Sequence, residues 1–328
     1  SPAGLWPGQT GYAASVKRVV AALLAALLLA GCPRNAAADA EAPEASGLPR
    51  FEGVTLSYHG DGVGQGPGLE ARLAKRFEEA TGATITLHPQ PRTREALEVY
   101  LARFEAMDQG LDVILLDVIW PGILAPHLRD LRTDLGAQAD AMFSELIRND
   151  TIGGRLVAMP FFSDAGLLYY RRDLLDRHGY AAPPTSWDEL ERMAATIQAA
   201  ERPKDPAFAG FLFQGDLYEG LTCNAIEWQQ SHGGGGIYAD DTGAVSVDNP
   251  RALRAFTRAA GWVGGIAPRA VLGYQEEDCR KAFQAGHAAF MRNWPYAWAE
   301  AAAPGSPVAG MIGVAPLPRD REDTRPAA

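Results

Sequence analysis

The sequence of 328 residues has few of the residues that build metal and nucleophile sites. It contains three cysteines and six histidines, and the histidines are scattered without the spacing of metal ligands. A Gly-x-Ser-x-Gly nucleophile motif does not occur. We therefore expect no catalytic centre, no metal and no organic cofactor. Aspartate and glutamate are plentiful, however, so a secreted glycoside hydrolase with a pair of carboxylates stays open as an alternative.

Basic residues are also in short supply. The chain carries 30 Lys and Arg against 40 Asp and Glu, which gives a formal net charge of −10. Nucleic-acid binding needs Lys and Arg concentrated on one surface. We therefore predict that nucleic acid is not a partner of this protein.

Long hydrophobic runs are missing as well. The apolar run Val19–Leu29 is too short to span a bilayer, follows the basic pair Lys17–Arg18 and leads into Ala30-Gly31-Cys32. This arrangement resembles the lipobox of an exported lipoprotein. We predict that residues 1–31 are a signal peptide with upstream residues, and that Cys32 is lipidated and anchors the protein to a membrane, in the periplasm or at the cell surface.

The two remaining cysteines are Cys223 and Cys279. An exported protein meets oxidising conditions in which such a pair can form a disulfide. Pairing also requires the two Cα atoms to lie within about 7 Å of each other, which the sequence does not reveal. A Cys223–Cys279 disulfide therefore stays open.

Glycine and proline are abundant, with 35 and 23 residues, and glycine alternates with other residues over positions 60–68. No three of these glycines have the spacing of a dinucleotide-binding loop, and the lysine of a phosphate-binding loop is absent. We interpret this segment as a mobile turn after a strand and not as a nucleotide site.

The pattern of apolar residues predicts an α/β fold with mainly parallel sheets. Expected strands cover residues 54–58, 83–87, 112–118, 155–159, 167–170 and 288–291. Expected helices cover residues 69–81, 96–107, 186–200 and 253–263, and the last of these is marked by the apolar residues Leu253, Phe256, Ala260 and Val263. Another helix begins at Glu276, because the acids Glu276, Glu277 and Asp278 favour a helix N-terminus through the helix dipole. Ser186 and Glu189 have the spacing of a capping box, which marks the start of the third of these helices.

Aromatic side chains stand beside acids and amides in four segments that are expected to be loops. These segments are Leu116–Trp120, Phe162–Ala165, Tyr218–Gly220 and Asn293–Trp298. A sugar ring has apolar faces that aromatic rings cover, and hydroxyls that carboxylates and amides bind. The clustering therefore favours sugar binding over four unrelated core aromatics.

Six short sequence segments strengthen this interpretation, through both their residues and the order in which they occur along the chain. They are LDVIWPGILAPHLRDL, PFFSDAGLLYYRRDLL, PPTSWDEL, YEGLTCNAIEW, GGGG and AAFMRNWPYAW. Together they resemble the trehalose/maltose (and sucrose or palatinose) binding proteins of bacterial ABC importers, in the extracellular solute-binding family that includes maltose-binding protein. The resemblance covers about residues 54–318. It implies a two-lobed periplasmic binding fold of type II, each lobe a sheet flanked by helices, which closes on sugar about a hinge.

The resemblance also implies which residues bind sugar. By matching motif, Asp117 and Asp164 bind hydroxyls, Trp294 and Tyr296 form a stacking wall, and other contacts come from residues in the same loops, namely Trp120, Phe162, Tyr218 and Glu219. Asp61, in the loop after the first strand, matches more loosely. Two roles stay open for Arg292, which either serves the site or braces the loop, and bracing is favoured.

The implied organisation has five parts. They are residues 1–31 (signal), 32–50 (lipidated cysteine and flexible tether), 51–160 (first lobe), 161–312 (second lobe) and 313–328 (second crossing between lobes and truncated end). Family members continue further, so we expect a chain less stable than a complete homologue, in which the first lobe exposes a sheet edge.

The function implied by the resemblance is that of a substrate-binding lipoprotein. It would capture an α-linked disaccharide and deliver it to ABC permease subunits in the inner membrane, as a monomer and without enzymatic activity. Besides the glycoside hydrolase, a non-binding truncated remnant and a surface adhesin stay open. Which disaccharide binds is not specified by the sequence.

Overall fold

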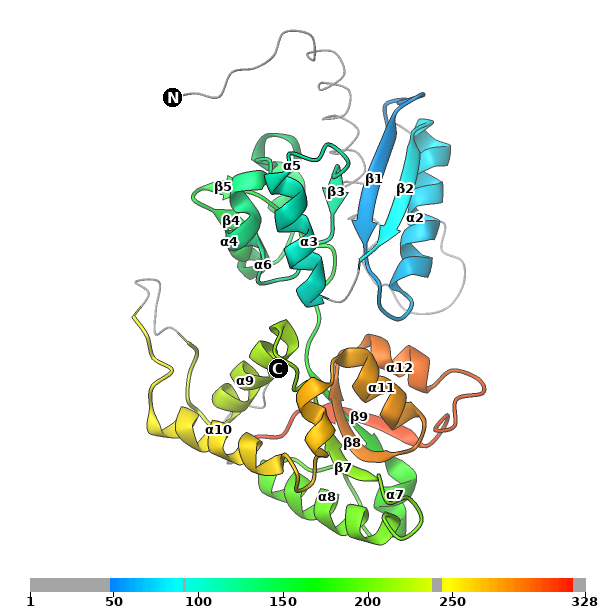
Figure 1. Ribbon diagram of the computed structural model, residues 1–328, viewed down its shortest axis with the longest axis vertical. Coiled ribbons are helices and arrows are strands. Elements are labelled where there is room, and N and C mark those ends of the chain that lie inside the picture. Colours follow the sequence, from blue (N-terminus) through cyan, green and yellow to red (C-terminus); the bar gives the residue numbers. More distant parts are fainter. Residues whose placement is uncertain (1–47, 91–92, 238–243, 321–328) are drawn as a thin grey trace. The chain divides into compact units, whose positions relative to one another are not determined.

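The computed structural model describes residues 48–90, 93–237 and 244–320. Cys32 lies outside these ranges. The chain divides into two compact units, residues 1–163 and 164–328 (Figure 1).

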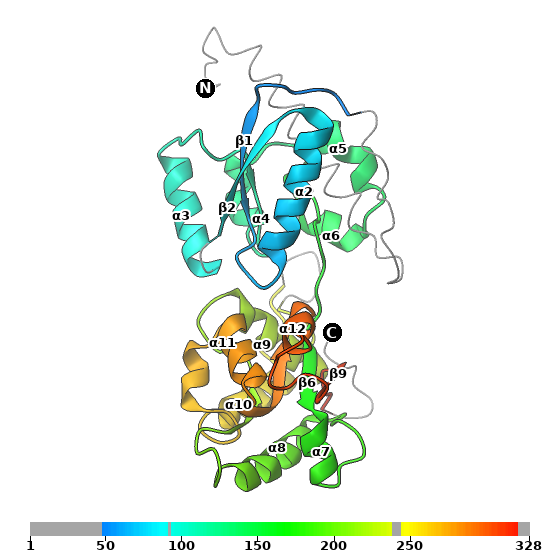
Figure 2. The same cartoon turned by 90° about the vertical axis from the view of Figure 1, so that its right-hand side faces the viewer.

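The first unit contains a three-stranded parallel sheet in the order β2-β1-β3 and a separate hairpin, β4-β5 (Figure 1). Its elements are β1 (Thr55–Gly60), α2 (Gly66–Thr81), β2 (Thr84–Pro89), α3 (Thr93–Glu105), β3 (Val113–Ile114), α4 (Pro121–Leu124), η1 (Ala125–His127), α5 (Arg132–Ala139), α6 (Ser144–Asn149), β4 (Thr151–Ile152) and β5 (Arg155–Leu156). The expected strands at 112–118 and 155–159 are thus much shorter in the structure. Figure 2 shows helix α2 beside β1 and β2. The predicted end of the first helix is confirmed at Gly82, which has a left-handed backbone and donates its N–H to Glu78.

In the described part of the chain, three apolar clusters hold the first unit together, and one of them is formed by Leu131, Leu135, Ala139 and Leu156. Phe77 of α2 packs with Leu56 and Tyr58 of β1. Tyr100 of α3 packs with Trp120, next to α4. Helices on both sides thereby cover the apolar side chains of a short parallel sheet, as such sheets require.

The second unit contains a four-stranded sheet in the order β7-β8-β6-β9. Its elements are β6 (Leu167–Arg171), α7 (Arg172–Arg177), α8 (Trp187–Glu201), β7 (Ala209–Leu212), α9 (Glu219–Ser231), α10 (Pro250–Trp262), η2 (Arg269–Gly273), α11 (Glu276–Gln284), β8 (Ala288–Asn293), α12 (Tyr296–Ala301) and β9 (Ile312–Pro316). Strand β7 is parallel to β8, whereas β6 is antiparallel to both β8 and β9.

The prediction of mainly parallel sheets is therefore correct for the first unit and wrong for the second. Strand β6 brings the chain into the second unit, and its first residue, Leu167, pairs with Pro316 at the end of β9. The incoming and outgoing strands must run in opposite directions to meet in this way. Residues 313–316, expected in a crossing between lobes, are accordingly part of this sheet.

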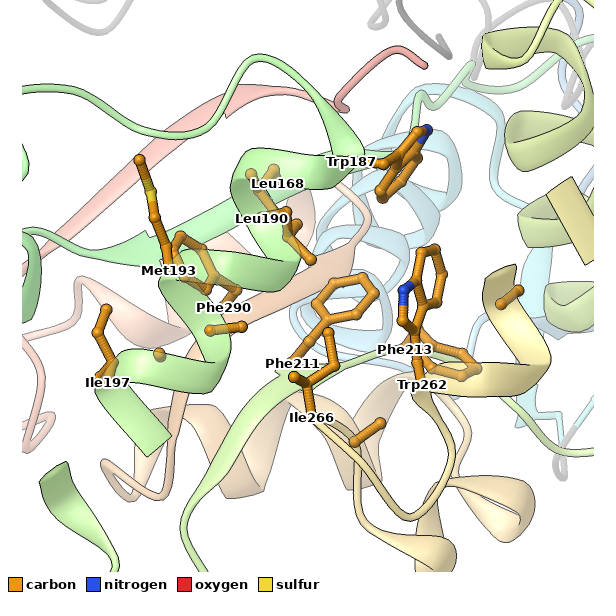
Figure 3. Close-up of a cluster of buried hydrophobic side chains, with 14 of the residues drawn as sticks. Leu168, Trp187, Leu190, Met193, Ile197, Phe211, Phe213, Trp262, Ile266 and Phe290 are labelled. Carbon is orange, nitrogen blue, oxygen red and sulfur yellow. The ribbon is translucent and has the colours of Figure 1, made fainter. Parts of the chain in front are cut away.

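Helices cover both faces of the second sheet, and successive strand residues alternate between them. Leu168, Phe211 and Phe290 point toward α8, α9 and α10, where tryptophans fill the core (Figure 3). Tyr169 and Met291 point to the other face, where α11 and α12 pack. This arrangement of helix layer, sheet and helix layer keeps the ends of the strands free for a site.

The start of α8 follows from its sequence. The Ser186 hydroxyl accepts a hydrogen bond from the Glu189 N–H (3.2 Å), and the Glu189 carboxylate accepts one from the Ser186 N–H (3.3 Å). The predicted capping box is confirmed. It places Trp187 at the first helical position, fully buried.

Helix α10 exists as predicted, but it presents a different face to the core. Its buried residues are Ala252, Ala255, Ala259 and Trp262, whereas Leu253 of the expected face is 68% exposed. Small alanines let α10 approach α9 closely, and Trp262 alone reaches the centre of the core. Leu253 lines a groove of about 1060 Å³ that extends along α8 and α10.

A buried histidine makes the stability of the second unit depend on pH. His232 is 2% exposed, with Nδ1 2.7 Å from the Trp228 carbonyl and Nε2 3.5 Å from the Asp320 carboxylate. Burial lowers its pKa, against the opposing effect of Asp320. The unfolded chain then binds the proton more readily, so stability is full above pH of about 6.5 and falls below it, by at most about 1.4 kcal/mol per pH unit.

Urea unfolding at pH of about 7.5 and 5.5 measures this dependence, which His232→Gln should reduce. An unchanged slope in that variant would assign the effect to other groups.

Residues 48–90, 93–237 and 244–320 contain neither a helix that could span a membrane nor a group of side chains that could bind a metal. None of their helices combines the length and the apolar character that crossing a membrane requires. Nor do their His, Cys, Asp and Glu side chains form a group of three or more that could hold a metal ion.

Candidate functional site

Two predicted site residues of the first unit lie at one edge of its sheet. Strands β1, β2 and β3 run parallel, Asp61 follows β1 directly, and Asp117 lies shortly after β3. The Leu115 N–H donates to the His59 carbonyl (2.7 Å), and the Gln90 side chain donates to the Leu115 carbonyl (2.6 Å). Open α/β sheets bind ligands at the carboxyl ends of their strands, which is where Asp61 and Asp117 are found.

The glycine-rich segment after β1 holds Asp61 in place. The Asp61 N–H donates to both carboxylate oxygens of Glu70 (2.9 and 3.0 Å), which also accepts from the Tyr58 hydroxyl. The Asp61 carboxylate in turn accepts from the Val63 N–H (2.8 Å), and a side chain at Gly66 would overlap it. Burial raises the pKa of both Asp61 and Glu70. The glycines therefore allow a tight loop around a partly buried carboxylate.

Asp117 and Trp120, predicted together, have different surroundings. The Asp117 carboxylate accepts from the Ile119 N–H (3.2 Å) in a turn and is half-buried. Trp120 is only 2% exposed and packs edge-on against Tyr100, with ring centroids 6.2 Å apart. The prediction that Trp120 contacts ligand is wrong, because the turn directs its indole into the core beside Leu124.

Phe162 and Asp164 fall on the two sides of the division between the units. Phe162 is the penultimate residue of the first unit, 57% exposed, and packs edge-on against Phe161 at 5.8 Å. Asp164 is the first residue of the second unit and is exposed. Both side chains are therefore open to solvent in the segment that connects the two units.

The remaining predicted residues gather at one edge of the second sheet. The start of β6 lies beside the end of β8, since Leu167 pairs with Asn293, and β7 ends at the same edge because it is parallel to β8. The segments at this edge carry five of the predicted residues, namely Asp164, Tyr218, Glu219, Trp294 and Tyr296.

Two carboxylates of α11 hold the aromatic side chains of this edge. Glu276 accepts from the Tyr218 hydroxyl (2.6 Å) and from the Trp294 indole N–H (3.2 Å). Glu277 accepts from the Tyr296 hydroxyl (2.9 Å). Burial, reinforced by these carboxylates, raises the pKa of Tyr218 and Tyr296 far above that of free tyrosine. Both phenols therefore stay protonated and keep donating at neutral pH.

Arg292 contacts three side chains at the same edge, those of Glu227, Gln214 and Trp294. It is 1% exposed, donates through Nε to Glu227 (3.0 Å) and through a terminal nitrogen to the Gln214 side chain (3.1 Å), and pairs with Glu227 a second time. Its guanidinium carbon lies 3.6 Å from the centre of the Trp294 ring. Burial raises the pKa of Glu227, and Arg292 opposes this shift. A side chain at Gly166 would overlap both partners.

The structure contradicts the Cys223–Cys279 disulfide, because both thiols are free. The Cys223 thiol donates to the Glu219 carboxylate, and Cys279 is fully buried in the core beside Phe283. The Cys223 side chain thus lies in polar surroundings, and the Cys279 side chain lies in the apolar core.

Thiol labelling should distinguish the two cysteines. Burial raises the pKa of both thiols, so little reactive thiolate forms at neutral pH. We expect iodoacetamide to modify half-buried Cys223 slowly in the native chain, and fully buried Cys279 only after unfolding. Mass spectrometry of peptides locates the label, and a cross-linked Cys223–Cys279 peptide from untreated protein would contradict the structure.

The sequence did not single out four residues that organise the second unit's edge. They are Gln214, Glu227, Glu276 and Glu277. Glu276 and Glu277 were interpreted only as favourable charges at a helix start. The signal that could have found Glu276 and Glu277 is a pair of adjacent acids in the first turn of a helix, followed by a strand that ends at Asn293 and leads into Trp-Pro-Tyr.

The sequence profile of the bacterial extracellular solute-binding protein family matches residues 60–325. A "Probable ABC transporter-binding protein" of Deinococcus radiodurans is 48% identical over 267 residues, which cover 81% of this chain and 63% of that protein. The chain thus spans less than two thirds of this relative's length.

Solved structures share the fold. The maltose-bound MalE3 of T. maritima is 38% identical, with a TM-score of 0.74 over 81% of this chain and 68% of that one. An ABC transporter solute-binding protein of Agrobacterium radiobacter K84, in complex with ribitol, is 24% identical with a TM-score of 0.71 over 84% and 69% of the two chains, and supports the fold alone. The α/β fold is that of two-lobed periplasmic sugar-binding proteins, as predicted.

Proposed function

Because this chain belongs to the bacterial extracellular solute-binding protein family, we propose that it captures sugar for an ABC importer. We propose further that the ligand is an α-linked disaccharide of the trehalose, maltose or sucrose type. The relatives are binding proteins and not enzymes, so the chain is not an enzyme and the glycoside hydrolase alternative is not favoured.

One observation carries the choice of ligand. Tyr218, Trp294 and Tyr296 converge on two adjacent carboxylates at one edge of the second sheet, and Asp164 and Glu219 lie in the segments of the same edge. Aromatic faces cover the apolar faces of sugar rings, and carboxylates bind their hydroxyls. The 38% identity to a maltose-bound protein supports the same class of ligand.

The first unit would supply the second part of the site. Asp61 and Asp117 are proposed to bind hydroxyls, with Phe162 contacting a sugar face. Hinged binding proteins shift toward a closed form when ligand binds, and we propose the same response to ligand for this chain. We propose residues 51–160 and 161–312 as the two lobes, with the end of β9 assigned to the second.

The remaining parts of the proposal concern location and partners. Export, lipidation of Cys32, delivery to permease subunits and a monomeric state all follow from the lipobox and the family resemblance. Cys32→Ser, expressed in bacteria supplied with labelled palmitate, should lose the label that the unchanged chain incorporates. Equal labelling of both proteins would remove Cys32 as the anchor.

Isothermal titration with trehalose, maltose, sucrose, glucose and ribitol tests the function. We expect a disaccharide to bind near micromolar Kd, or about −8 kcal/mol, with glucose and ribitol weaker. Binding to none of the five by a chain that unfolds cooperatively would reject the proposal. Glucose released on incubation with disaccharide would instead support the glycoside hydrolase.

Removing a hydroxyl-binding carboxylate should weaken binding without unfolding the chain. We expect Asp117→Ala and Asp164→Ala each to lose about 1–3 kcal/mol of binding free energy, because sugar hydroxyls would be left unpaired in the closed site. Asp176→Ala, at an exposed position of α7, serves as the control and should bind normally. Unchanged affinity in either of the first two variants would remove that residue from the site.

A further inference from the structure

One carboxylate of the second unit connects aromatic residues from two separate loops. Glu276 is the first residue of α11, and one of its oxygens accepts from both the Tyr218 hydroxyl (2.6 Å) and the Trp294 indole (3.2 Å). Its backbone carbonyl also accepts from the Asn293 side chain (3.1 Å). Tyr218 precedes α9 and Trp294 follows β8, so the contact fixes two loops that the chain does not join directly (Figure 1).

Glu276 differs from its neighbour in how its charge is balanced. Glu277 is held by Arg280 through two bonds of 2.7 Å, whereas no basic side chain in the described part of the chain lies within 4.0 Å of the Glu276 carboxylate. The negative charge at the start of a helix is stabilised by the helix dipole. The Glu276 carboxylate thus accepts from two aromatic donors, which indicates that it orients them and does not form a structural ion pair.

Trp294 is half-buried, and one face of its ring is covered by Arg292. The Arg292 guanidinium lies over one face at 3.6 Å from the ring centre. The Asn293 side chain accepts from the Trp294 backbone N–H (2.8 Å). With its indole N–H already bound to Glu276, Trp294 can contact a sugar through its second face but has no donor left to offer. The Tyr218 hydroxyl likewise can only accept from the ligand.

We propose that Glu276 is a positioning residue of the sugar site, which presets Tyr218 and Trp294 in the orientation that stacks on the ligand before the ligand arrives. This inference rests on the proposed function. Preorganised rings bind more tightly because their rotational freedom is already lost in the free protein. The Glu276 carboxylate itself does not touch sugar.

The test compares Glu276→Gln with the unchanged full chain. An amide keeps the shape of the side chain but loses the charge that strengthens both hydrogen bonds. We expect affinity for the best disaccharide of the panel to fall about 10- to 100-fold, with little change in the thermal midpoint. Glu300→Gln on α12, whose carboxylate lies 4.0 Å from Arg280, is the matched control and should bind as the unchanged chain does.

Two further readouts separate orientation from a general effect on folding. The fluorescence of Trp294 is obtained by subtracting the emission of Trp294→Phe. Acrylamide should quench this fluorescence more strongly in Glu276→Gln, because the Trp294 ring is then held less firmly. In a chain that already carries Tyr218→Phe and Trp294→Phe, adding Glu276→Gln should change affinity less than about threefold, because its targets are absent.

Each outcome decides one question. Two results would contradict the positioning role in a chain that binds sugar. In the first, Glu276→Gln keeps full affinity. In the second, Glu276→Gln lowers affinity by the same factor in the unchanged chain and in the chain that carries Tyr218→Phe and Trp294→Phe. If the unchanged chain binds no sugar, the proposed function fails. The quenching measurement, which needs no ligand, then still decides whether Glu276 orients Trp294.

Discussion

Arg292→Met is expected to destabilise the second unit by about 3–5 kcal/mol, because it leaves the Glu227 carboxylate without its partner in a buried position. Arg292 is 1% exposed and makes two bonds to Glu227 and one to Gln214. Removing the Arg292 guanidinium should also expose the face of the Trp294 ring that it covers. Urea unfolding, followed by circular dichroism, measures the change in free energy of unfolding.

Two comparisons identify the cause of this loss. Adding Glu227→Gln to Arg292→Met should recover part of the stability, since the orphaned charge is removed. Because burial raises the pKa of Glu227, the loss in the single variant should shrink as pH falls and the carboxylate takes up a proton. Arg177→Met, at a half-exposed ion pair with Glu201, should cost no more than about 1 kcal/mol. Equal losses for Arg292 and Arg177 would show that burial of the pair is not the cause.

Trp262→Ala is expected to lower the free energy of unfolding by about 3–5 kcal/mol, because it leaves a cavity in the core. Trp262 is 3% exposed and packs against four other aromatic rings at 5.2–6.0 Å. Three of them belong to Trp187, Phe211 and Phe213 (Figure 3), and the fourth belongs to Trp228. The Trp262 indole N–H also donates to Glu191 (2.6 Å). Thermal unfolding should place the midpoint of the variant well below that of the unchanged chain.

The control for this prediction is Trp298→Ala. Trp298 is 44% exposed on α12, so its removal opens no enclosed cavity and should cost less than about 1 kcal/mol. A comparable loss for both tryptophans would mean that the aromatic cluster around Trp262 does not dominate the stability of the second unit.

Local signals in the sequence sufficed wherever a few neighbouring residues decide the outcome. Ser186 and Glu189 define the start of α8, and Gly82 ends α2, because caps and left-handed turns depend on residues within one turn of the helix. The strings around Asp164, Tyr218 and Trp294 likewise predicted segments that the fold brings to one sheet edge. Alternation of strands and helices was enough for the fold class.

Other features depended on contacts between distant segments. Trp120 was predicted to contact ligand, although a turn directs its side chain toward Tyr100. The buried face of α10 was predicted wrongly, because no local feature of the sequence indicates how closely α9 approaches that helix. The sequence left the pairing of Cys223 with Cys279 open, since pairing depends on where two helices place their side chains.

The sequence by itself determined strands β1, β2, β6 and β8, helices α2, α3, α8, α10 and α11, and the aromatic and acidic residues near the ends of the strands. Propensity, capping and hydrophobic period act over short stretches of chain, which is why these elements could be predicted. Tertiary structure alone decided the antiparallel course of β6 and the partners of each side chain at the candidate site. Glu276, separated from Tyr218 by 58 positions, becomes its hydrogen-bond partner only when the second sheet has formed. A hydrogen bond requires two atoms to lie within about 3 Å, and for residues so far apart in the chain only the folded arrangement sets that distance.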